Sequence, residues 1–508
     1  MKYLFVDDHH VERIDNLARK LHQPRKFEGN AVLRPEHRWE NMYIRTWGAP
    51  VWDAGAEIFK MIYLGTAAPD VATIGTGAAL KLDAGGDAGA SGNYSCYATS
   101  SDGVNWEKPF LHLYDYPGLT WKGTPIGGEN NILPSIRGQI RGPVYHAREA
   151  DPARRFKALT YRDGHLYTLV SADCIQWQEL DVPPQPSADV SELYLDEDRD
   201  LLISTVKHRG PYGRSFYLST SEDFRTWSEQ ELIFHADQTD QENGFERLRR
   251  FFEDPALLAP VHNRPEEWRT DVYHFPVFRY EDLYLGLPVM HHWAGKRPPL
   301  FENVDSRKTM ELACSRDLHQ WERVANRAPF LELSPAGDGS RYDTGQIGST
   351  NGVLRRNGEL WIYYTAARRR GVPIAEAAFH GFLDSAAICM ARLRLDGFVS
   401  LKGGVERGSV LTVPLEVTGP ELHLNVDAWR GRVLAEVTDE HGSALPGYAA
   451  EECIPVVVDS TDQVVRWRDR GSLAELQGRR VRLRLSLWQA ELYAVWFGPD
   501  GQSALSSS

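Results

Sequence analysis

A short turn motif that ends in tryptophan recurs along this chain and restricts the folds that it can adopt. Each copy is a strand-like run followed by Ser-x-Asp, with a tryptophan four residues after the aspartate, and the copies span 97–106, 167–177, 217–227 and 312–321. A degenerate fifth copy, 389–398, keeps the aspartate and ends in phenylalanine. Repetition on this scale predicts a radial array of small sheets. The aspartate closes a tight turn, and the tryptophan covers the edge of one sheet against the next. The motif therefore predicts architecture, and function must come from other residues.

Two apolar strands precede each copy of the motif, so that every repeat has the strands of one small sheet. The predicted sheets span 46–99, 142–171, 190–220, 271–314 and 348–393. The spacing between the repeated aspartates is irregular, which indicates insertions between strands, and such loops commonly build a binding face. We therefore expect an all-β chain that starts with a five-bladed β-propeller.

The two ends of the chain have different patterns. Apolar residues at Val11, Ile14, Leu17 and Leu21 have helical spacing and predict a short amphipathic helix, and residues 3–6 are expected to be a strand that closes the ring. Beyond residue 403 the pattern alternates with period two between glycine-rich turns, which is typical of a β-sandwich. The expected domains are a propeller at 1–402 with a helix-containing segment at 9–30, a C-terminal β-sandwich at 403–500 and a disordered tail at 501–508.

Composition excludes several classes of protein. The 508-residue chain has a net charge of -13, which disfavours nucleic-acid binding. No run approaches the 18 apolar residues that a membrane span needs, and the first residues are charged too early for a secretory signal, so we expect a cytoplasmic protein. Its 15 tryptophans and 21 tyrosines are more than packing requires, as is common where aromatic faces stack on sugar rings.

Cysteine and histidine spacing gives no indication of a metal or a cofactor. The five cysteines include no Cys-x-x-Cys pair, and buried reduced thiols are the expected state. The adjacent pairs His9-His10 and His291-His292 would point to opposite faces of a strand, which is a poor chelating geometry. We expect neither a metal nor an organic cofactor.

Four segments carry a resemblance to a known family. The run Asn-Ala-Val-Leu-Arg-Pro-Glu-His-Arg-Trp-Glu at 30–40, the repeated turn motif, Tyr-Asp-Thr-Gly-Gln at 342–346 and Trp-Ile-Tyr-Tyr at 361–364 resemble the five-bladed propeller proteins related to glycoside hydrolase family 32. Such proteins are also similar to family 43, and the segments 465–467 and 491–493 resemble the sandwich module that follows the propeller. The resemblance implies a glycoside hydrolase acting on a furanoside, such as a fructan- or arabinan-like glycan.

The chain also departs from that family. The Asn-Asp-Pro nucleophile motif of the fructan hydrolases is absent near the first repeat, and no Arg-Asp-Pro follows in the second or third. The run Glu253-Asp254-Pro255 is expected in a loop. The family's catalytic triad is therefore not transferred to this sequence.

Candidate catalytic residues come instead from the ends of the predicted inner strands. Glycosidic cleavage generally needs two carboxyl groups, and Asp189, Asp271 and Asp343 stand where three inner strands begin, with Glu40 ahead of the first repeat. Carboxylates that converge there would repel one another and raise at least one pKa, which would create a proton donor. The alternative is that each aspartate caps a turn and that Glu40 pairs with a neighbouring arginine.

Candidate binding residues surround the same strand ends. Trp47 is a stacking platform or a packing residue, and hydroxyl-binding partners are Tyr273, Gln346, Arg141, His208 and His291. If Arg141, Arg209, Arg214 and Arg341 join His208 in the cavity, they would hold phosphate, and the enzyme would be a glycoside phosphorylase. A non-catalytic carbohydrate-binding propeller is a third alternative. The expected partner is a carbohydrate, and the sandwich is a candidate surface for a homo-oligomer.

Overall fold

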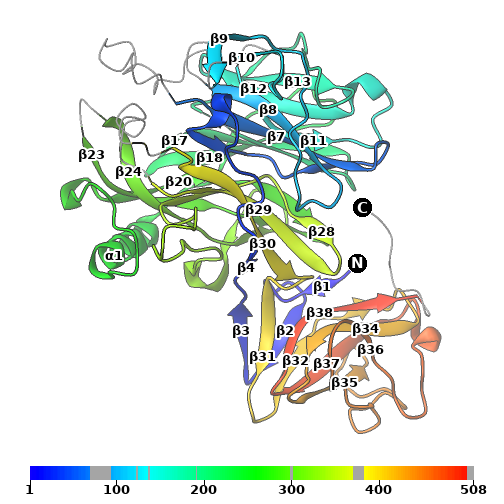
Figure 1. Ribbon diagram of the computed structural model, residues 1–508. Coiled ribbons are helices and arrows are strands. Elements are labelled where there is room, and N and C mark those ends of the chain that lie inside the picture. The colour runs from blue at the N-terminus through cyan, green and yellow to red at the C-terminus, as the bar shows by residue number, and fades with distance from the viewer. Residues whose placement is uncertain are drawn as a thin grey trace.

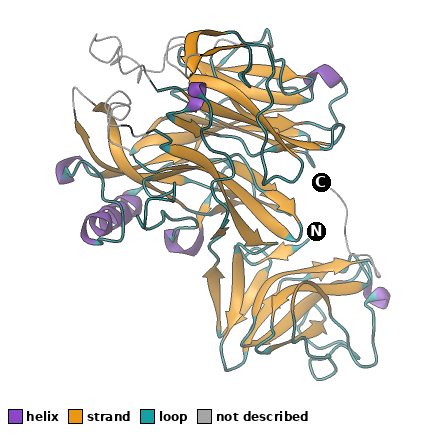
Figure 2. Cartoon of the chain, in the orientation of Figure 1, coloured by secondary structure: helices purple, strands orange, loops and turns teal. Residues whose placement is uncertain are grey.

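The computed structural model describes residues 1–68, 93–121, 124–134, 138–189, 191–297, 301–369, 381 and 383–499. Strands are the main regular element of these residues, with one α-helix, α1 (Gln238–Glu253), among them (Figures 1 and 2). The all-β fold class predicted from the sequence is confirmed. Within these ranges, none of the helices is long and apolar enough to cross a membrane. The predicted tail, 501–508, lies outside the described residues.

In the described residues, antiparallel sheets follow one another along the chain, and we number them 1 to 5, grouping two neighbouring sheets as sheet 4. Sheet 1 contains β5 (Tyr43–Arg45), β6 (Val51–Asp53), β7 (Ile58–Thr66) and β8 (Asn93–Ser100). Sheet 2 contains β11 (Ile140–Tyr145), β12 (Phe156–Arg162), β13 (His165–Ser171), β14 (Gln178–Glu179) and β15 (Gln185–Pro186). Sheet 3 contains β16 (Glu192–Asp196), β17 (Leu201–Gly210), β18 (Gly213–Ser221) and β19 (Glu231–Phe234). The hairpin of β9 (Tyr116–Trp121) and β10 (Thr124–Gly127) is separate.

Sheets 4 and 5 come next along the chain. Sheet 4 is built from two consecutive ladders: β20 (Arg269–His274), β23 (Val289–Arg297) and β24 (Phe301–Met310), then β21 (Val277–Tyr280), β22 (Leu283–Gly286), β25 (Ala313–Ser315) and β26 (Glu322–Arg323). Sheet 5 contains β27 (Gln346–Ser349), β28 (Leu354–Arg356), β29 (Glu359–Ala367) and β30 (Ala386–Arg394). Its outermost strand is β4 (Arg25–Lys26), which pairs with Ala391 and Arg392 of β30.

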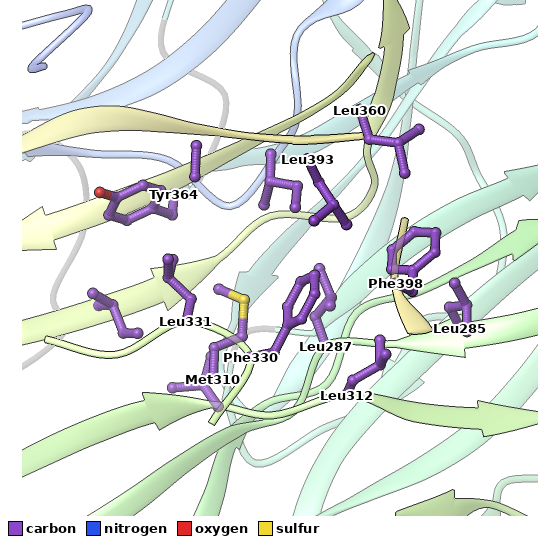
Figure 3. Close-up of a cluster of buried hydrophobic side chains, with 14 of the residues drawn as sticks. Leu285, Leu287, Met310, Leu312, Phe330, Leu331, Leu360, Tyr364, Leu393 and Phe398 are labelled. Atoms are coloured by element: carbon purple, nitrogen blue, oxygen red, sulfur yellow. The ribbon is translucent and has the colours of Figure 1, made fainter. Parts of the chain in front are cut away.

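Sheets 1 to 5 contact one another in succession, and the last contacts the first. Each sheet contacts the next through β11, β16, β20 and β27, and β30 of sheet 5 contacts β5 of sheet 1. Apolar side chains fill the space between neighbouring sheets. Figure 3 shows the largest of these clusters, in which Leu285, Met310 and Leu312 of sheet 4 face Leu360 and Leu393 of sheet 5. Burial of such clusters is the main stabilising contribution to a ring of this kind.

The N-terminal segment forms strands that pair with residues near 400–412, and the predicted helix in 9–30 is wrong. Residues 11–21 form β2 (Val11–Asp15) and β3 (Leu17–Leu21), which pair with β32 and β31. A bulge between Val11 and Arg13 places Val11 and Ile14 against the same apolar core, and Asn16 (φ 52°) reverses the chain between the strands. The apolar spacing that resembled a helix therefore comes from a bulge and a turn.

Two further sheets combine N-terminal and C-terminal strands, and their apolar side chains form one core. One contains β1 (Tyr3–Leu4), β3, β31 (Val399–Gly403), β34 (Glu421–Asp427), β36 (Asp459–Val464) and β38 (Glu491–Gly498). The other contains β2, β32 (Gly408–Thr412), β33 (Leu415–Glu416), β35 (Arg432–Thr438) and β37 (Arg480–Trp488). Residues 3 and 4 pair with β38 and do not close the ring, because β4 occupies that edge. The predicted boundary at 402/403 falls inside β31.

The repeated aspartates close turns as predicted. In all four copies one carboxylate oxygen accepts the backbone N–H groups two and three residues ahead, as Asp223 does from Arg225 and Thr226 at 2.7 Å each. The N–H groups of Thr226 and Arg225 lower the pKa of Asp223 to about 2. The tryptophans pack into clusters shared with the preceding sheet, as Trp106 does against Tyr363 of sheet 5.

Asn351 joins four of the five sheets near the axis of the ring. Its side-chain N–H groups donate to the carbonyls of Gly142 (3.1 Å) and Leu193 (2.7 Å), and its amide oxygen accepts the N–H of Ala49 at 2.8 Å. Asn351 itself lies between β27 and β28 of sheet 5. The first strands of sheets 2 and 3 and the segment after the first strand of sheet 1 therefore meet at this side chain.

Asn351→Ala is expected to lower the free energy of unfolding by about 3 kcal/mol, because three buried hydrogen bonds lose their partner and each is worth about 1 kcal/mol. Chemical denaturation followed by tryptophan fluorescence measures the change. The matched control is Asn263→Ala, at an exposed position, which should change stability by less than about 0.5 kcal/mol. Equal stability of the two variants would contradict the role given to Asn351.

Candidate active site

Polar side chains gather where the first strands of the five sheets begin. Arg45 of β5 and Arg141 of β11 both contact the ring of Trp47. Gln346, at the start of β27, donates to Ser306 Oγ of sheet 4 at 2.7 Å. Asp271 in β20 accepts from Arg214 of sheet 3. Residues that are far apart in the sequence are therefore brought to one end of the ring.

A cavity of about 560 Å³ lies at this end, between sheets 3 and 4. We call it the basic cavity, and it is lined by Ala188, Asp189, Lys207, His208, Arg209, Gly210, Pro211, Tyr212, Gly213, Arg214, Gln241, Arg269, Asp271 and Trp293. Four cationic side chains face two carboxylates in this lining, although the chain as a whole has a net charge of -13. A local excess of positive charge in an acidic protein indicates an anionic ligand.

Asp189 is the more accessible of the two carboxylates. Its side chain is 41% exposed, and its Oδ2 lies 3.1 Å from Nζ of the buried Lys207. Asp189 lies shortly before β16, the first strand of sheet 3, as predicted from the sequence, and its charge also acts on Arg141. It is thus a carboxylate that a ligand in the basic cavity can reach.

Asp271 is held by a chain of hydrogen bonds. Its Oδ2 accepts from Arg214 Nη1 at 2.8 Å, and its Oδ1 lies 3.1 Å from His291 Nδ1. His291 Nε2 lies 2.7 Å from Ser306 Oγ, which also accepts from Gln346. These partners assign the proton of a neutral His291 to Nδ1, with Ser306 donating to Nε2. Three of the sequence-predicted residues therefore belong to one network.

The charges in this network follow from its burial. Burial lowers the pKa of His291 to about 3, so the imidazole is neutral at neutral pH. Burial would raise the pKa of Asp271, yet the hydrogen bond from His291 and the positive charge of Arg214 together hold it below its ordinary value. Asp271 is therefore an ionised carboxylate that orients Arg214, and it has no proton to donate at neutral pH.

The other two predicted carboxylates are enclosed and do not line the basic cavity. Asp343 is buried, with its Oδ2 2.6 Å from Lys26 Nζ and 3.1 Å from the Tyr364 hydroxyl. Glu40 is fully buried, and it accepts from Lys108 Nζ at 2.6 Å, from the Tyr63 hydroxyl at 2.7 Å and from backbone N–H groups. Their contacts give both residues a structural role: Asp343 secures the ring-closing β4, and Glu40 caps a short helical turn.

The predicted binding residues occupy several positions around the cavity. His208 lines it, with Nε2 2.6 Å from Gln230 Oε1. Tyr273 lies under Lys207 and Lys308, whose Nζ atoms are 4.6 and 3.3 Å from its ring centre. Trp47 is only 8% exposed, so it offers no open platform for a sugar ring. Of the four arginines considered for phosphate, Arg209 and Arg214 line the basic cavity.

Glu192 was not among the candidates chosen from the sequence. It lies in β16, is 3% exposed, and has Oε1 2.7 Å from His274 Nδ1, while its Oε2 is buried without a hydrogen-bond partner. Burial raises the pKa of Glu192 to about 8, so the carboxyl is protonated at neutral pH. The available signal was an acidic residue inside an apolar inner strand, three positions after Asp189.

One group in the described part of the chain has the spacing of metal ligands. His9, His10 and Asp282 place their ligand atoms within 4.8 Å of one another, outside the basic cavity. Asp282 Oδ2 already binds Arg316 Nη1 at 2.7 Å and His10 Nε2 at 2.5 Å. The carboxylate is thus neutralised by an arginine, which does not favour a cation at this position.

Comparisons with known proteins give similarity at low identity. No protein-family model and no curated protein matches the chain. Among solved structures, a glycoside hydrolase is 14% identical with a TM-score of 0.40, covering 73% of this chain and 92% of that one. A β-1,2-mannobiose phosphorylase from Listeria innocua is 10% identical with a TM-score of 0.41, covering 73% and 96%.

A third structure is described in the words "The GH130 family of mannoside phosphorylases contains glycoside hydrolases that target beta-1,2 mannosidic linkages in Candida mannan". It is 14% identical with a TM-score of 0.39, covering 74% of this chain and 94% of that one. The resemblance to families 32 and 43 stays a prediction. The chemistry of the site must be inferred from its own residues.

Proposed function

We propose that this protein is a glycan-cleaving enzyme that transfers a glycosyl group to inorganic phosphate. The observation that carries the proposal is the basic cavity, in which Lys207, Arg209, Arg214 and Arg269 surround the one exposed carboxylate, Asp189. Arginine and lysine hold phosphate through charge-assisted hydrogen bonds. A basic cluster beside a single accessible carboxyl group is the arrangement expected for phosphorolysis.

The arginines of the basic cavity differ in how they are engaged. Arg214 is fixed by Asp271, whereas Arg209 and Arg269 form no ion pair with any carboxylate among the described residues. Arg269 stacks on Trp293, with its guanidinium carbon 3.5 Å from the ring centre. Two guanidinium groups are thus left to bind an anion, and a third is oriented beside them.

In the proposed reaction, one bond forms at the anomeric carbon and one breaks. An oxygen of hydrogen phosphate forms a bond to the anomeric carbon while the bond from that carbon to the glycosidic oxygen breaks. The carboxylate of Asp189, which pairs with Lys207, takes the proton of hydrogen phosphate and passes it to the leaving oxygen. The products are a glycosyl phosphate and a shortened glycan.

Hydrolysis is the second candidate, because Asp189 and Asp271 line the same cavity and paired carboxyl groups are what glycoside hydrolysis needs. The proposed substrate class remains a glycan, and furanosides such as fructans and arabinans belong in the same assay as pyranosides. Water would then replace phosphate as the attacking group, and no glycosyl phosphate would form.

The test is product analysis with and without phosphate. A panel of furanoside and pyranoside oligosaccharides is incubated with the protein, and ³¹P NMR detects any glycosyl phosphate. Phosphorolysis predicts a phosphate-dependent reaction. Free sugar released equally without phosphate would replace the proposal with hydrolysis, and binding without cleavage would replace it with a non-catalytic propeller.

Arg209→Gln is expected to raise the KM for phosphate about 10- to 100-fold, because one charge-assisted hydrogen bond is worth about 1.5–3 kcal/mol. Initial rates at varied phosphate concentration measure this effect. The matched control is Arg148→Gln, at an exposed position outside the cavity, which should leave the KM unchanged. The same KM in both variants would remove Arg209 from the phosphate site.

A further inference from the structure

Two arginines at the start of sheets 1 and 2 stack on one tryptophan. The guanidinium carbons of Arg45 and Arg141 lie 4.9 and 4.2 Å from the centre of the Trp47 ring. The backbones of the two sheets are in close contact here, because a Cβ on Gly48 would meet the Cα of Gly142 at 2.8 Å. We call Arg45, Trp47 and Arg141 the arginine stack, and none of its members lines the basic cavity.

The arginine stack has buried N–H groups without partners. Nε and Nη1 of Arg141 are buried and make no hydrogen bond, and only Nη2 is engaged, with Gln139 Oε1 at 2.7 Å. Nε of Arg45 is also buried without a partner. Neither arginine forms an ion pair with a carboxylate in the described part of the chain. Each unsatisfied buried donor costs about 1–3 kcal/mol, and native proteins leave few of them.

Arg141 of the stack remains charged at neutral pH and lies near Asp189. Burial lowers the pKa of Arg141 to about 10, which is still far above neutrality, and the charge of Asp189 opposes this shift. Asp189 also binds Lys207 of the basic cavity. Two cations therefore lie near the proposed catalytic carboxyl group: Lys207 in the basic cavity and Arg141 in the arginine stack.

We infer that the arginine stack binds an oxyanion carried by the sugar, either the carboxylate of a uronic acid or a sulfate ester, so that the substrate is an acidic glycan. An oxyanion would supply acceptors for the unpaired Nε and Nη1 of Arg141 and for Nε of Arg45. Guanidinium groups are well suited to this, since their planar N–H array matches carboxylate and sulfate oxygens. This inference rests on the proposed function for its glycan, and it adds the chemical class of that glycan.

The two cationic sites would have different roles, one for phosphate and one for the anion of the sugar. Phosphate in the basic cavity and a sugar anion at the stack would place the anomeric carbon between them, beside Asp189. Neutral sugars would leave the buried N–H groups of Arg141 unpaired, and specificity of this kind arises because such unpaired groups cost free energy. The stack would thus select acidic glycans over neutral glycans of the same shape.

Matched sugar pairs test the inference in solution. Calorimetry and saturation-transfer NMR compare D-glucuronate with D-glucose and D-galacturonate with D-galactose, since each pair differs only at C6 and samples both anomers. Glucose 6-sulfate separates a sulfate preference from a carboxylate preference, and inorganic phosphate alone reports on the basic cavity. The wild type should bind an acidic sugar about 10- to 100-fold more tightly than its neutral partner.

Arg141→Gln should remove this preference while leaving the affinity for phosphate unchanged, and Arg209→Gln should do the reverse. Arg45→Gln and Arg141→Lys serve as second variants, with thermal melts to establish that each variant folds. Equal affinity of the wild type for acidic and neutral sugars would overturn the inference, as would a preference that survives in both Arg45→Gln and Arg141→Gln. If cleavage needed no phosphate but acidic sugars were still preferred, phosphorolysis would be refuted and the inference about acidic glycans would stand.

Discussion

Asp189→Asn is expected to lower kcat/KM on the glycan substrate by about 10²- to 10⁴-fold, the range that a positioned general acid contributes. Asparagine has nearly the same shape and can still accept from Lys207, whose Nζ lies 3.1 Å from Asp189 Oδ2, but it cannot exchange a proton with the glycosidic oxygen. Steady-state kinetics with phosphate present measures the loss. Substrates with a strongly acidic leaving group need less protonation and should lose less.

The matched control is Asp181→Asn, an exposed aspartate that does not line the basic cavity. It should have wild-type kinetics. Turnover by Asp189→Asn at the wild-type rate would exclude Asp189 as the proton donor. A uniform loss on all substrates, whatever the leaving group, would instead assign Asp189 a role in binding.

Glu192→Gln is expected to flatten the dependence of stability on pH between about 5 and 8. Burial raises the pKa of Glu192 from 4.5 to about 8, so the folded protein keeps this proton over a range where the unfolded chain releases it. The stabilisation is fully present below about pH 4.5 and is lost as the pH rises through about 8, with a slope of about 1.4 kcal/mol per pH unit. Glutamine does not titrate and can still accept from His274 Nδ1, so the variant should gain about 3–4 kcal/mol relative to wild type across this range.

Guanidinium denaturation at pH 5, 6, 7 and 8 checks this expectation. The control is Glu197→Gln, which changes an exposed carboxylate just beyond the same strand and should leave the pH slope at the wild-type value. If wild type and Glu192→Gln had the same slope, Glu192 would be ionised in the folded protein. The unpaired Oε2 would then need a cationic partner.

Much of the fold could be predicted because its signals are local. The Ser-x-Asp turn with its tryptophan is set by hydrogen bonds within five residues, such as those from Arg225 and Thr226 to Asp223. Alternating apolar residues likewise predict the strands of the C-terminal part, such as β34, β35 and β37. The segment 11–21 was assigned incorrectly because a bulge and the left-handed Asn16 gave two strands an apolar spacing of three and four.

The site could be predicted only in part. Strand starts are visible in the sequence, so Asp189, Asp271 and Arg141 could be placed at one end of the ring. The pairing of Asp343 with Lys26 and of Glu192 with His274 depends on contacts between sheets that are distant in the sequence. Such contacts decide which carboxylate is enclosed, which is exposed and which keeps its proton, and no local pattern encodes them.

The pairing of β1 to β4 with later strands affects when this protein can fold during its synthesis. The strands that are synthesised first pair with strands that are synthesised late: β2 pairs with β32, β3 with β31 and β1 with β38. The sheets that contain β1 to β3 cannot be completed from the N-terminal part of the chain alone, and such long-range pairing slows folding. Nascent chains that stop before residue 491 should expose the edges of β1, β31 and β34 that pair with β38, so the full fold should form only after synthesis is nearly finished.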